Sequence, residues 1–198
     1  MPSIKFEKSF SGIICGIDEA GRGPWAGPVV AAAVILGPKK PRGINDSKKM
    51  TAEKREELYS RLVDTAKYGV GQASVEEIDR INILQATKLA MLRAYEALAV
   101  ECDHALIDGN QLPNLPCRMQ YVIKGDAISF SIAAASIIAK VTRDRILLQL
   151  HEEFPHYGWN SNKGYCAKYH QQAVEKHGLT VHHRRAWSLT NGQLELAI

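Results

Sequence analysis

Two adjacent acidic residues stand where an apolar segment of the chain ends. Asp18 and Glu19 follow the apolar run 12–17 and precede the glycine-rich turn 21–24. Neighbouring carboxylates at the end of a buried strand repel each other and lose hydration, so they persist there when a cation neutralises them or one is protonated. Because carboxylate oxygens are hard ligands, the pair indicates magnesium or manganese rather than zinc. The alternative is a surface turn whose acids face water.

Two further acids are candidates for the same site. Asp108 ends a second apolar segment, 105–107, and a Gly-Asn turn follows it. The ends of neighbouring strands are where sites assemble in open α/β sheets, so Asp18 and Asp108 converge if their strands are adjacent. Asp126 comes just before the longest helical segment. On its own it is interpreted as a turn or helix-start acid.

Six motifs in one order resemble the ribonuclease HII family, the type 2 ribonucleases H. The first is the stretch 18–24, which an apolar segment, 27–34, follows. The others are Asn45-Asp46-Ser47-Lys48-Lys49, Ile107-Asp108-Gly109-Asn110, Lys124-Gly125-Asp126, the run from Ala134 to Asp144, and Lys163-Gly164-Tyr165. Together they cover the chain from about residue 12 to residue 187.

The resemblance implies an endonuclease and its cofactors. Such an enzyme cleaves the RNA strand of RNA/DNA hybrids and nicks duplex DNA 5′ of an embedded ribonucleotide, leaving 3′-hydroxyl and 5′-phosphate ends. Its role is to remove misincorporated ribonucleotides and RNA primers. The implied catalytic residues and metal ligands are Asp18, Glu19, Asp108 and Asp126. Four carboxylates in one cleft need roughly two divalent cations, here Mn²⁺ or Mg²⁺.

Recognition of ribose is expected from the glycine-rich turn and from one tyrosine. Gly21, Arg22 and Gly23 can bring bare backbone close to a sugar, and the resemblance assigns them that task. Tyr165 offers a ring to pack on a deoxyribose and a hydroxyl to bond the ribose. In the family this tyrosine selects a ribonucleotide followed by a deoxynucleotide. A partly buried structural tyrosine is the alternative.

Phosphate contacts are expected from basic and polar side chains. Ser136, Lys140 and Arg143 recur at intervals of four and three, so they share one helix stripe. The other candidates are Lys48, Lys49 and Lys163. A solvated helix face is the alternative. From Lys163 to Arg185 the chain carries five Lys or Arg and a single acid, which favours a nucleic-acid surface.

Composition favours a small enzyme inside the cell. A chain of 198 residues can bury roughly 70% of its unfolded surface. Its four cysteines are irregularly spaced, so they argue against a zinc ribbon and are expected to be reduced. No apolar run reaches the ~18 residues of a membrane span. We expect a soluble, cytoplasmic monomer with no membrane contact, whose partners are RNA/DNA hybrid and ribonucleotide-containing duplex DNA.

The apolar periodicity predicts an α/β protein with a mixed sheet. Strands are expected near 12–18, 28–36, 68–73, 104–108 and 119–123. Helices are expected from Thr51 to about 67, after Ser74, from Ile83 to Leu98 and from Ser131 to about Phe154. The resemblance implies the ribonuclease H-like fold, a five-stranded sheet flanked by helices. Residues 1–145 are predicted to form the catalytic core, and residues 146–198 a helical C-terminal extension packed on it.

Two rival functions are open at this stage. One is another enzyme of the same fold, such as a resolvase or a type 1 ribonuclease H. The other is a hybrid-binding module without catalysis, which the presence of all four acids disfavours. Catalysis by histidine is also disfavoured, and His182 and His183 are interpreted as a structural or phosphate-facing cluster.

The end of the chain suggests a protein partner. Gln193 to Ile198 resembles the short glutamine-leucine peptides by which bacterial repair proteins dock on the sliding clamp, but it lacks a clear terminal aromatic residue. Tethering to a clamp would raise the local concentration of a nuclease that searches for rare ribonucleotides. A weak clamp contact is therefore one interpretation, and a tail that rests on the enzyme or does nothing is the other.

Overall fold

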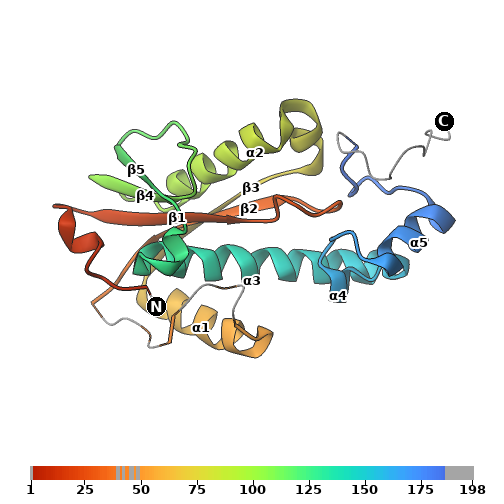
Figure 1. The fold of residues 1–198 in the computed structure, drawn as a ribbon, viewed down its shortest axis with the longest axis horizontal. Helices are drawn as coiled ribbons and strands as arrows, with labels where there is room; N and C mark the ends of the chain where they lie inside the picture. The colour runs from red at the N-terminus through yellow and green to blue at the C-terminus, as the bar shows by residue number, and fades with distance from the viewer. Residues whose placement is uncertain (1, 39–40, 42, 45–46, 48–49, 186–198) are drawn as a thin grey trace.

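Five strands form one mixed sheet in the computed structural model, which describes residues 2–38, 41, 43–44, 47 and 50–185. The strand order is β3-β2-β1-β4-β5 (Figure 1). The strands are β1 (Ile14–Ala20), β2 (Val29–Ile35), β3 (Lys67–Ala73), β4 (His104–Asp108) and β5 (Arg118–Val122). Each lies within two residues of a predicted strand, so the predicted set is confirmed.

The pairing of the strands brings two chain segments together that are far apart in sequence. β2 is antiparallel to both β1 and β3, whereas β4 lies parallel to both β1 and β5. Ile17 of β1 is paired with Ile107 of β4. The residues that follow them, Asp18 and Asp108, therefore lie at the same end of neighbouring parallel strands.

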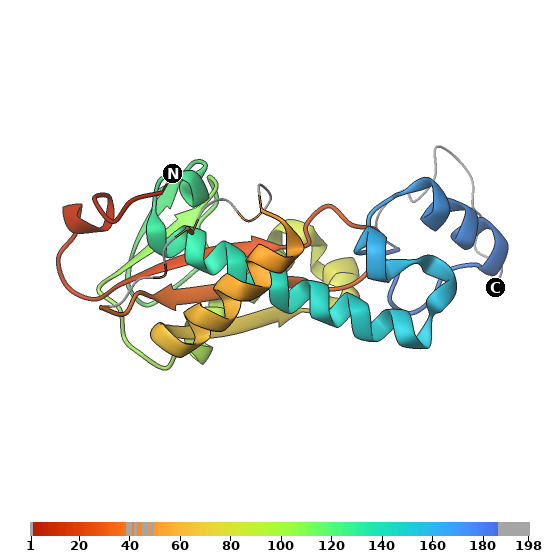
Figure 2. The ribbon, with the colours of Figure 1, turned by 90° about the horizontal axis from the view of Figure 1, so that it is seen from below.

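Helices cover both faces of this sheet. The longer helices are α1 (Ala52–Thr65), α2 (Val75–Ala97) and α3 (Phe130–Glu153). The shorter ones are η1 (Glu7–Ser9), η3 (Gly125–Ala127), η4 (Pro155–Tyr157), α4 (Trp159–Asn162) and α5 (Lys168–His177). α2 packs on one face, and α3 with α1 on the other (Figures 1 and 2). A layered α/β architecture results, as predicted.

Helix α3 links the sheet to the C-terminal helices. Its 24 residues span about 36 Å, so it extends beyond the sheet, and α4 and α5 lie at its far end (Figure 2). Ala133, Ala134 and Ala135 are fully buried, and their small side chains let α3 pack closely on the sheet. On β1, a Cβ at Gly16 would meet the α3 backbone at Ser131 and Ile132, so glycine is required there.

The predicted division at 145/146 falls inside α3, so a core and an extension would share this helix. We retain that division as a prediction. Within the described ranges, no helix has the length and apolar character that a membrane crossing needs.

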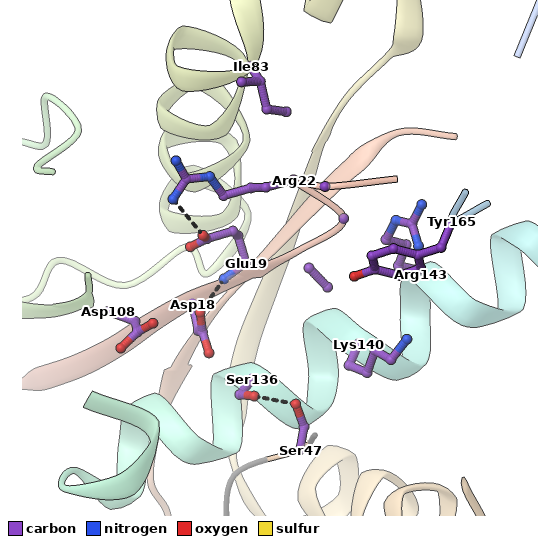
Figure 3. A pocket seen from close by; sticks show the side chains of 13 residues that line it. Asp18, Glu19, Arg22, Ser47, Ile83, Asp108, Ser136, Lys140, Arg143 and Tyr165 are labelled. Atoms are coloured by element: carbon purple, nitrogen blue, oxygen red, sulfur yellow. Dashed lines mark hydrogen bonds and ion pairs between the residues drawn. The ribbon is translucent and has the colours of Figure 1, made fainter. Parts of the chain in front are cut away.

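A break in α2 shapes one wall of the cleft described below. Ser74 caps the first turn and forms a capping box with Glu77. Asn82 then leaves helical geometry (φ 66°, ψ 164°), and its side chain accepts hydrogen bonds from the amides two and three residues further on. Both predicted helix starts are confirmed. The two helical segments are joined in α2, with a break at Asn82. The next residue, Ile83, reaches the cleft (Figure 3).

The break predicts an unusual ranking of substitutions. Asn82→Ala keeps a Cβ at positive φ, where alanine is less favourable than asparagine, and removes the cap, so we expect a loss of about 2 kcal/mol in unfolding free energy. Asn82→Gly also loses the cap but relieves the backbone, so it should cost about 1 kcal/mol less. Urea unfolding followed by circular dichroism measures both. Equal losses would show that the backbone at Asn82 is not strained.

Candidate active site

Asp18 and Asp108 lie side by side at the end of parallel strands (Figure 3). Asp18 is 6% exposed and its Oδ1 accepts a hydrogen bond from the Glu19 amide at 2.7 Å. Asp108 Oδ1 accepts one from the Gly125 amide at 2.6 Å, which ties η3 to β4. The convergence predicted from the strand ends is therefore present in the structure.

The other two acids approach from the same strand and from η3. Glu19 follows Asp18 on β1, and its Oε1 forms an ion pair with Arg22 Nη1 at 3.4 Å. Asp126 is in η3, immediately before α3, and is 8% exposed. Lys124 caps η3 in the left-handed conformation (φ 56°), which turns the chain from β5 back toward the sheet. Elements from three parts of the chain thus supply four acids.

The four acids form one electrostatic cluster. The pKa of Asp18 lies well above its ordinary value of 3.8, first because the carboxyl is buried and then because Glu19, Asp108 and Asp126 repel its negative charge. The hydrogen bond from the Glu19 amide opposes this rise only partly. A buried carboxyl surrounded by three others favours either a proton or a cation.

The donor chemistry of this cluster fits hard divalent cations. Within residues 2–38, 41, 43–44, 47 and 50–185, no group of three or more acidic, histidine or cysteine side chains is arranged so that it could hold a metal ion. The hydrogen bonds and the ion pair given above direct Asp18, Glu19 and Asp108 toward protein donors. Each carboxylate has a second oxygen, so rotation of these side chains would bring ligands to an ion.

A cavity of about 560 Å³ opens above the acids (Figure 3). Many of the residues expected from the sequence line it: Asp18, Glu19, Gly21, Arg22, Gly23, Asp108, Ser136, Lys140, Arg143 and Tyr165. Asp126 is buried and does not line it. Three of the four expected metal ligands and the expected ribose-recognition residues therefore share one cleft.

The glycine turn and Tyr165 face each other across this cleft. Gly21 has φ +100°, and a Cβ there would collide with the Arg143 side chain, so only glycine fits. The ring of Tyr165 lies 3.7 Å from where a Cβ of Gly23 would stand. Tyr165 is 49% exposed, which disfavours a buried structural role and leaves its ring accessible.

The expected phosphate contacts differ from one another in the structure. Lys140 lines the cavity, where its Nζ lies 2.7 Å from Asp144 and burial lowers its pKa. Ser136 is buried and donates to Ser47 Oγ at 2.6 Å. Lys163 donates to the Asn160 carbonyl. Lys48 and Lys49 are outside the described residues.

Arg143 lines the cavity but is buried in the structure. Its side chain is 1% exposed and donates to three backbone carbonyls, those of Ala26, Pro28 and Lys163. Helical spacing places it correctly on the stripe with Ser136 and Lys140, but the stripe passes from the cleft into the interior along α3. Arg143 therefore binds backbone carbonyls of the segments that form the walls of the cleft. Its charge does not face solvent.

His170 and His183 have structural roles. Trp159 Nε1 donates to His170 Nε2 at 3.1 Å, so His170 carries its proton on Nδ1 and donates to the Tyr165 carbonyl at 2.8 Å. His183 Nε2 donates to the same His170 nitrogen at 3.1 Å. Burial lowers the pKa of both residues, that of His183 to about 3, so both are neutral. For His183 this supports the structural alternative.

Sequence reasoning did not single out Ser47, Ile83 or Arg184 as site residues. Ser47 and Ile83 line the cavity, and Arg184 is a fully buried arginine bonded to the glycine turn. Ser47 stands inside a motif that the sequence shows, and Ile83 follows the capping residue Asn82, so both had a signal. Arg184 had none, because a basic pair near the end of a chain is ordinarily solvated.

Comparison with known proteins identifies the family. The family model described as ribonuclease HII matches residues 15–190. A ribonuclease HII from Paramagnetospirillum magneticum is 54% identical over 193 residues, which is 95% of this chain and 96% of that protein. Among solved structures, the PCNA:RNase HII complex from Archaeoglobus fulgidus superposes with a TM-score of 0.74 at 28% identity, covering 92% of this chain and 98% of that one. Bst-RNase HIII in complex with Mn²⁺ gives 0.74 at 18% identity, covering 89% and 67%.

The chain belongs to the ribonuclease HII family. The expected ribonuclease H-like fold is thereby confirmed, as is the expected activity, endonucleolytic hydrolysis of RNA in RNA/DNA hybrids and excision of ribonucleotides. A resolvase, a type 1 ribonuclease H and a binding module without catalysis are set aside.

The raised pKa of Asp18 predicts how stability depends on pH. The charged form of Asp18 is disfavoured in the folded protein. Its free-energy cost to folding is therefore absent below pH 3.8, the pKa of the carboxyl in the unfolded chain, and grows as the pH rises above that pKa. Without divalent metal, Asp18→Asn should stabilise the protein at pH 8 and have little effect at pH 4. Thermal melts in EDTA at both values measure this. Asp64→Asn, an exposed change on α1, is the control, and an equal gain from it at pH 8 would contradict the prediction.

Proposed function

We propose that Asp18, Glu19, Asp108 and Asp126 bind two divalent cations, Mn²⁺ or Mg²⁺, and that this centre carries the hydrolysis. The observation that supports it most is the burial of Asp18 beside three other carboxyls, whose charge requires compensation. Divalent ions at such a centre supply a deprotonated water and stabilise the charge on the phosphodiester oxygens. The Mn²⁺ complex of Bst-RNase HIII, a protein of the same fold, is in line with this choice of metal.

In this proposal the protein side chains position the scissile phosphate. The ends of β1 and β4 place two carboxylates side by side, and both strands lie in the interior of the sheet. With no covalent nucleophile, the products carry 3′-hydroxyl and 5′-phosphate ends, and the cut falls 5′ of a ribonucleotide embedded in duplex DNA. Arg22 is paired with Glu19. Rotation of Glu19 toward a cation would release Arg22 to the cleft.

Ribose is selected in this proposal by backbone and by one ring. Gly21, Arg22 and Gly23 line the cleft. Because the two glycines have no side chain, a sugar can approach the amides of the turn. The exposed ring of Tyr165 lies beside Gly23 and would pack against the neighbouring deoxyribose. Lys140 and Lys163 are the described candidates for phosphate contacts, with Lys48 and Lys49 added from the sequence.

The proposed partners are nucleic acid and, weakly, a sliding clamp. The relative from Archaeoglobus fulgidus was solved in complex with the clamp PCNA. The segment Gln193 to Ile198, outside the described residues, would supply the contact through Gln193 and Leu196. We further propose that the enzyme acts as a cytoplasmic monomer, with a catalytic core at 1–145 and the extension at 146–198.

The metal centre is tested by removing one carboxylate at a time. Asp18→Asn and Asp108→Asn should each lower the rate of cleavage about 1000-fold, equivalent to about 4 kcal/mol, because each loses a ligand. Hybrid binding should be retained, since the loss of a negative charge relieves repulsion of phosphate. The assay uses duplex DNA with one ribonucleotide and added Mg²⁺ or Mn²⁺. Turnover at the wild-type rate by either variant at saturating metal would exclude the four-carboxylate centre.

The role of Tyr165 is tested by a change of one atom. Tyr165→Phe removes the hydroxyl and keeps the ring, so we expect a loss of about tenfold in cleavage at a single embedded ribonucleotide, the value of one hydrogen bond. Tyr68→Phe on β3, away from the cleft, is the matched control and should act as the wild type does. Equal rates for the two variants would remove Tyr165 from ribose recognition.

A further inference from the structure

Arg184 binds the glycine turn from its buried side. Its side chain is fully buried, although the sequence places it in a basic tract near the end of the chain. Nη1 donates to the Arg22 carbonyl at 2.8 Å, and Nη2 donates to the Gly21 carbonyl. Nε and Nη2 both donate to the Gly27 carbonyl, at 3.1 and 2.8 Å. One guanidinium thus connects both ends of the turn between β1 and β2.

Arg143 fixes the same turn against the segment that carries Tyr165. Its three donors reach the carbonyls of Ala26, Pro28 and Lys163 at 2.9, 3.0 and 2.9 Å. The Gly164 carbonyl also accepts hydrogen bonds from the amides of Trp25 and Ala26. The turn, the Lys163–Tyr165 segment and Arg184 are therefore one hydrogen-bonded unit.

The direction of these hydrogen bonds fixes the direction of two amides. A trans peptide is planar, and its N–H points opposite to its carbonyl. Every described peptide bond is trans. Because the carbonyls of Gly21 and Arg22 point to Arg184, the amides of Arg22 and Gly23 point away from it, to the side where these residues line the cleft. Successive amides on one side form a concave group of donors suited to an oxygen.

Arginine is the side chain that this geometry requires. Burial and the repulsion of Arg143 lower the pKa of Arg184 to about 9, so the arrangement is costly. Its planar fork reaches three carbonyls at once, whereas the single ammonium of lysine cannot span them. A donor on a carbonyl also polarises the peptide, which makes the attached N–H a better donor on the other side.

We propose that Arg184 is a positioning residue for ribose recognition: it holds the Gly21 and Arg22 carbonyls so that the Arg22 and Gly23 amides meet the 2′-hydroxyl. Arg143 has the companion role of holding the turn at a fixed distance from Tyr165. The inference rests on the proposed function of the glycine turn in binding ribose. It assigns to the C-terminal segment a part in discriminating RNA from DNA.

The test compares Arg184→Lys with Arg185→Lys, the same chemical change one residue further on, at an exposed position. The measured quantity is ribonucleotide preference, defined as the inhibition constant of an all-DNA duplex divided by KM for the same duplex with one ribonucleotide. Arg184→Lys should lower this preference about tenfold and leave the inhibition constant unchanged. Arg185→Lys should keep the wild-type preference. General damage to the fold would instead raise the inhibition constant and KM together.

The outcomes separate the inference from the proposed function. A wild-type enzyme with no ribonucleotide preference would refute the proposed function itself. A folded Arg184→Lys variant with the wild-type preference would overturn the role of Arg184. If circular dichroism shows that this variant is unfolded, the ribonucleotide preference of Arg143→Lys is measured in its place.

The wild-type protein gives a second measurement. Hydrogen exchange at the Arg22 and Gly23 amides should slow when the ribonucleotide duplex binds and not when the all-DNA duplex binds. Equal protection by the two duplexes would overturn the proposed contact, whatever the variants show.

Discussion

Repulsion among four carboxyls at one edge of the sheet is the constraint on which the rest of the structure depends. The charges of Asp18, Glu19, Asp108 and Asp126 oppose one another, and burial of Asp18 intensifies this. The fold holds them with backbone donors, the Glu19 amide on Asp18 and the Gly125 amide on Asp108, and with Arg22 on Glu19. In the proposed function, divalent cations would offset this repulsion more strongly than these supports do.

The C-terminal segment completes the other side of the cleft. α3 is long enough to start beside the acids and end among α4 and α5, so one rigid helix spans both regions (Figure 1). From the far region, Arg184 reaches back to the glycine turn, and His170 donates to the Tyr165 carbonyl. The surface proposed to bind ribose is therefore held by buried groups that never meet the substrate. A division between core and extension does not correspond to a division between catalysis and binding.

Several elements could be predicted from the sequence because their signals are local. The strands show as apolar runs bounded by turns, and Ser74 with Glu77 and Asn82 with Gln85 mark two helix starts by capping alone. The side-chain roles were harder to predict. Ser136, Lys140 and Arg143 share one stripe, yet one is buried against Ser47, one lines the cleft and one holds backbone carbonyls. Spacing gives the face of a helix, but what covers that face depends on the rest of the chain.

The sequence by itself determined the order of strands and helices along the chain and the family, and it singled out three acids that line one cleft, because local pattern and motif order carry that information. Tertiary structure alone decided that β1 and β4 are parallel neighbours, which brings Asp18 beside Asp108 across some 90 residues of chain. It also decided that Arg184 is buried under the glycine turn. A basic residue near the end of a chain is ordinarily solvated, and only long-range packing could supply the three carbonyls that keep this one in the interior.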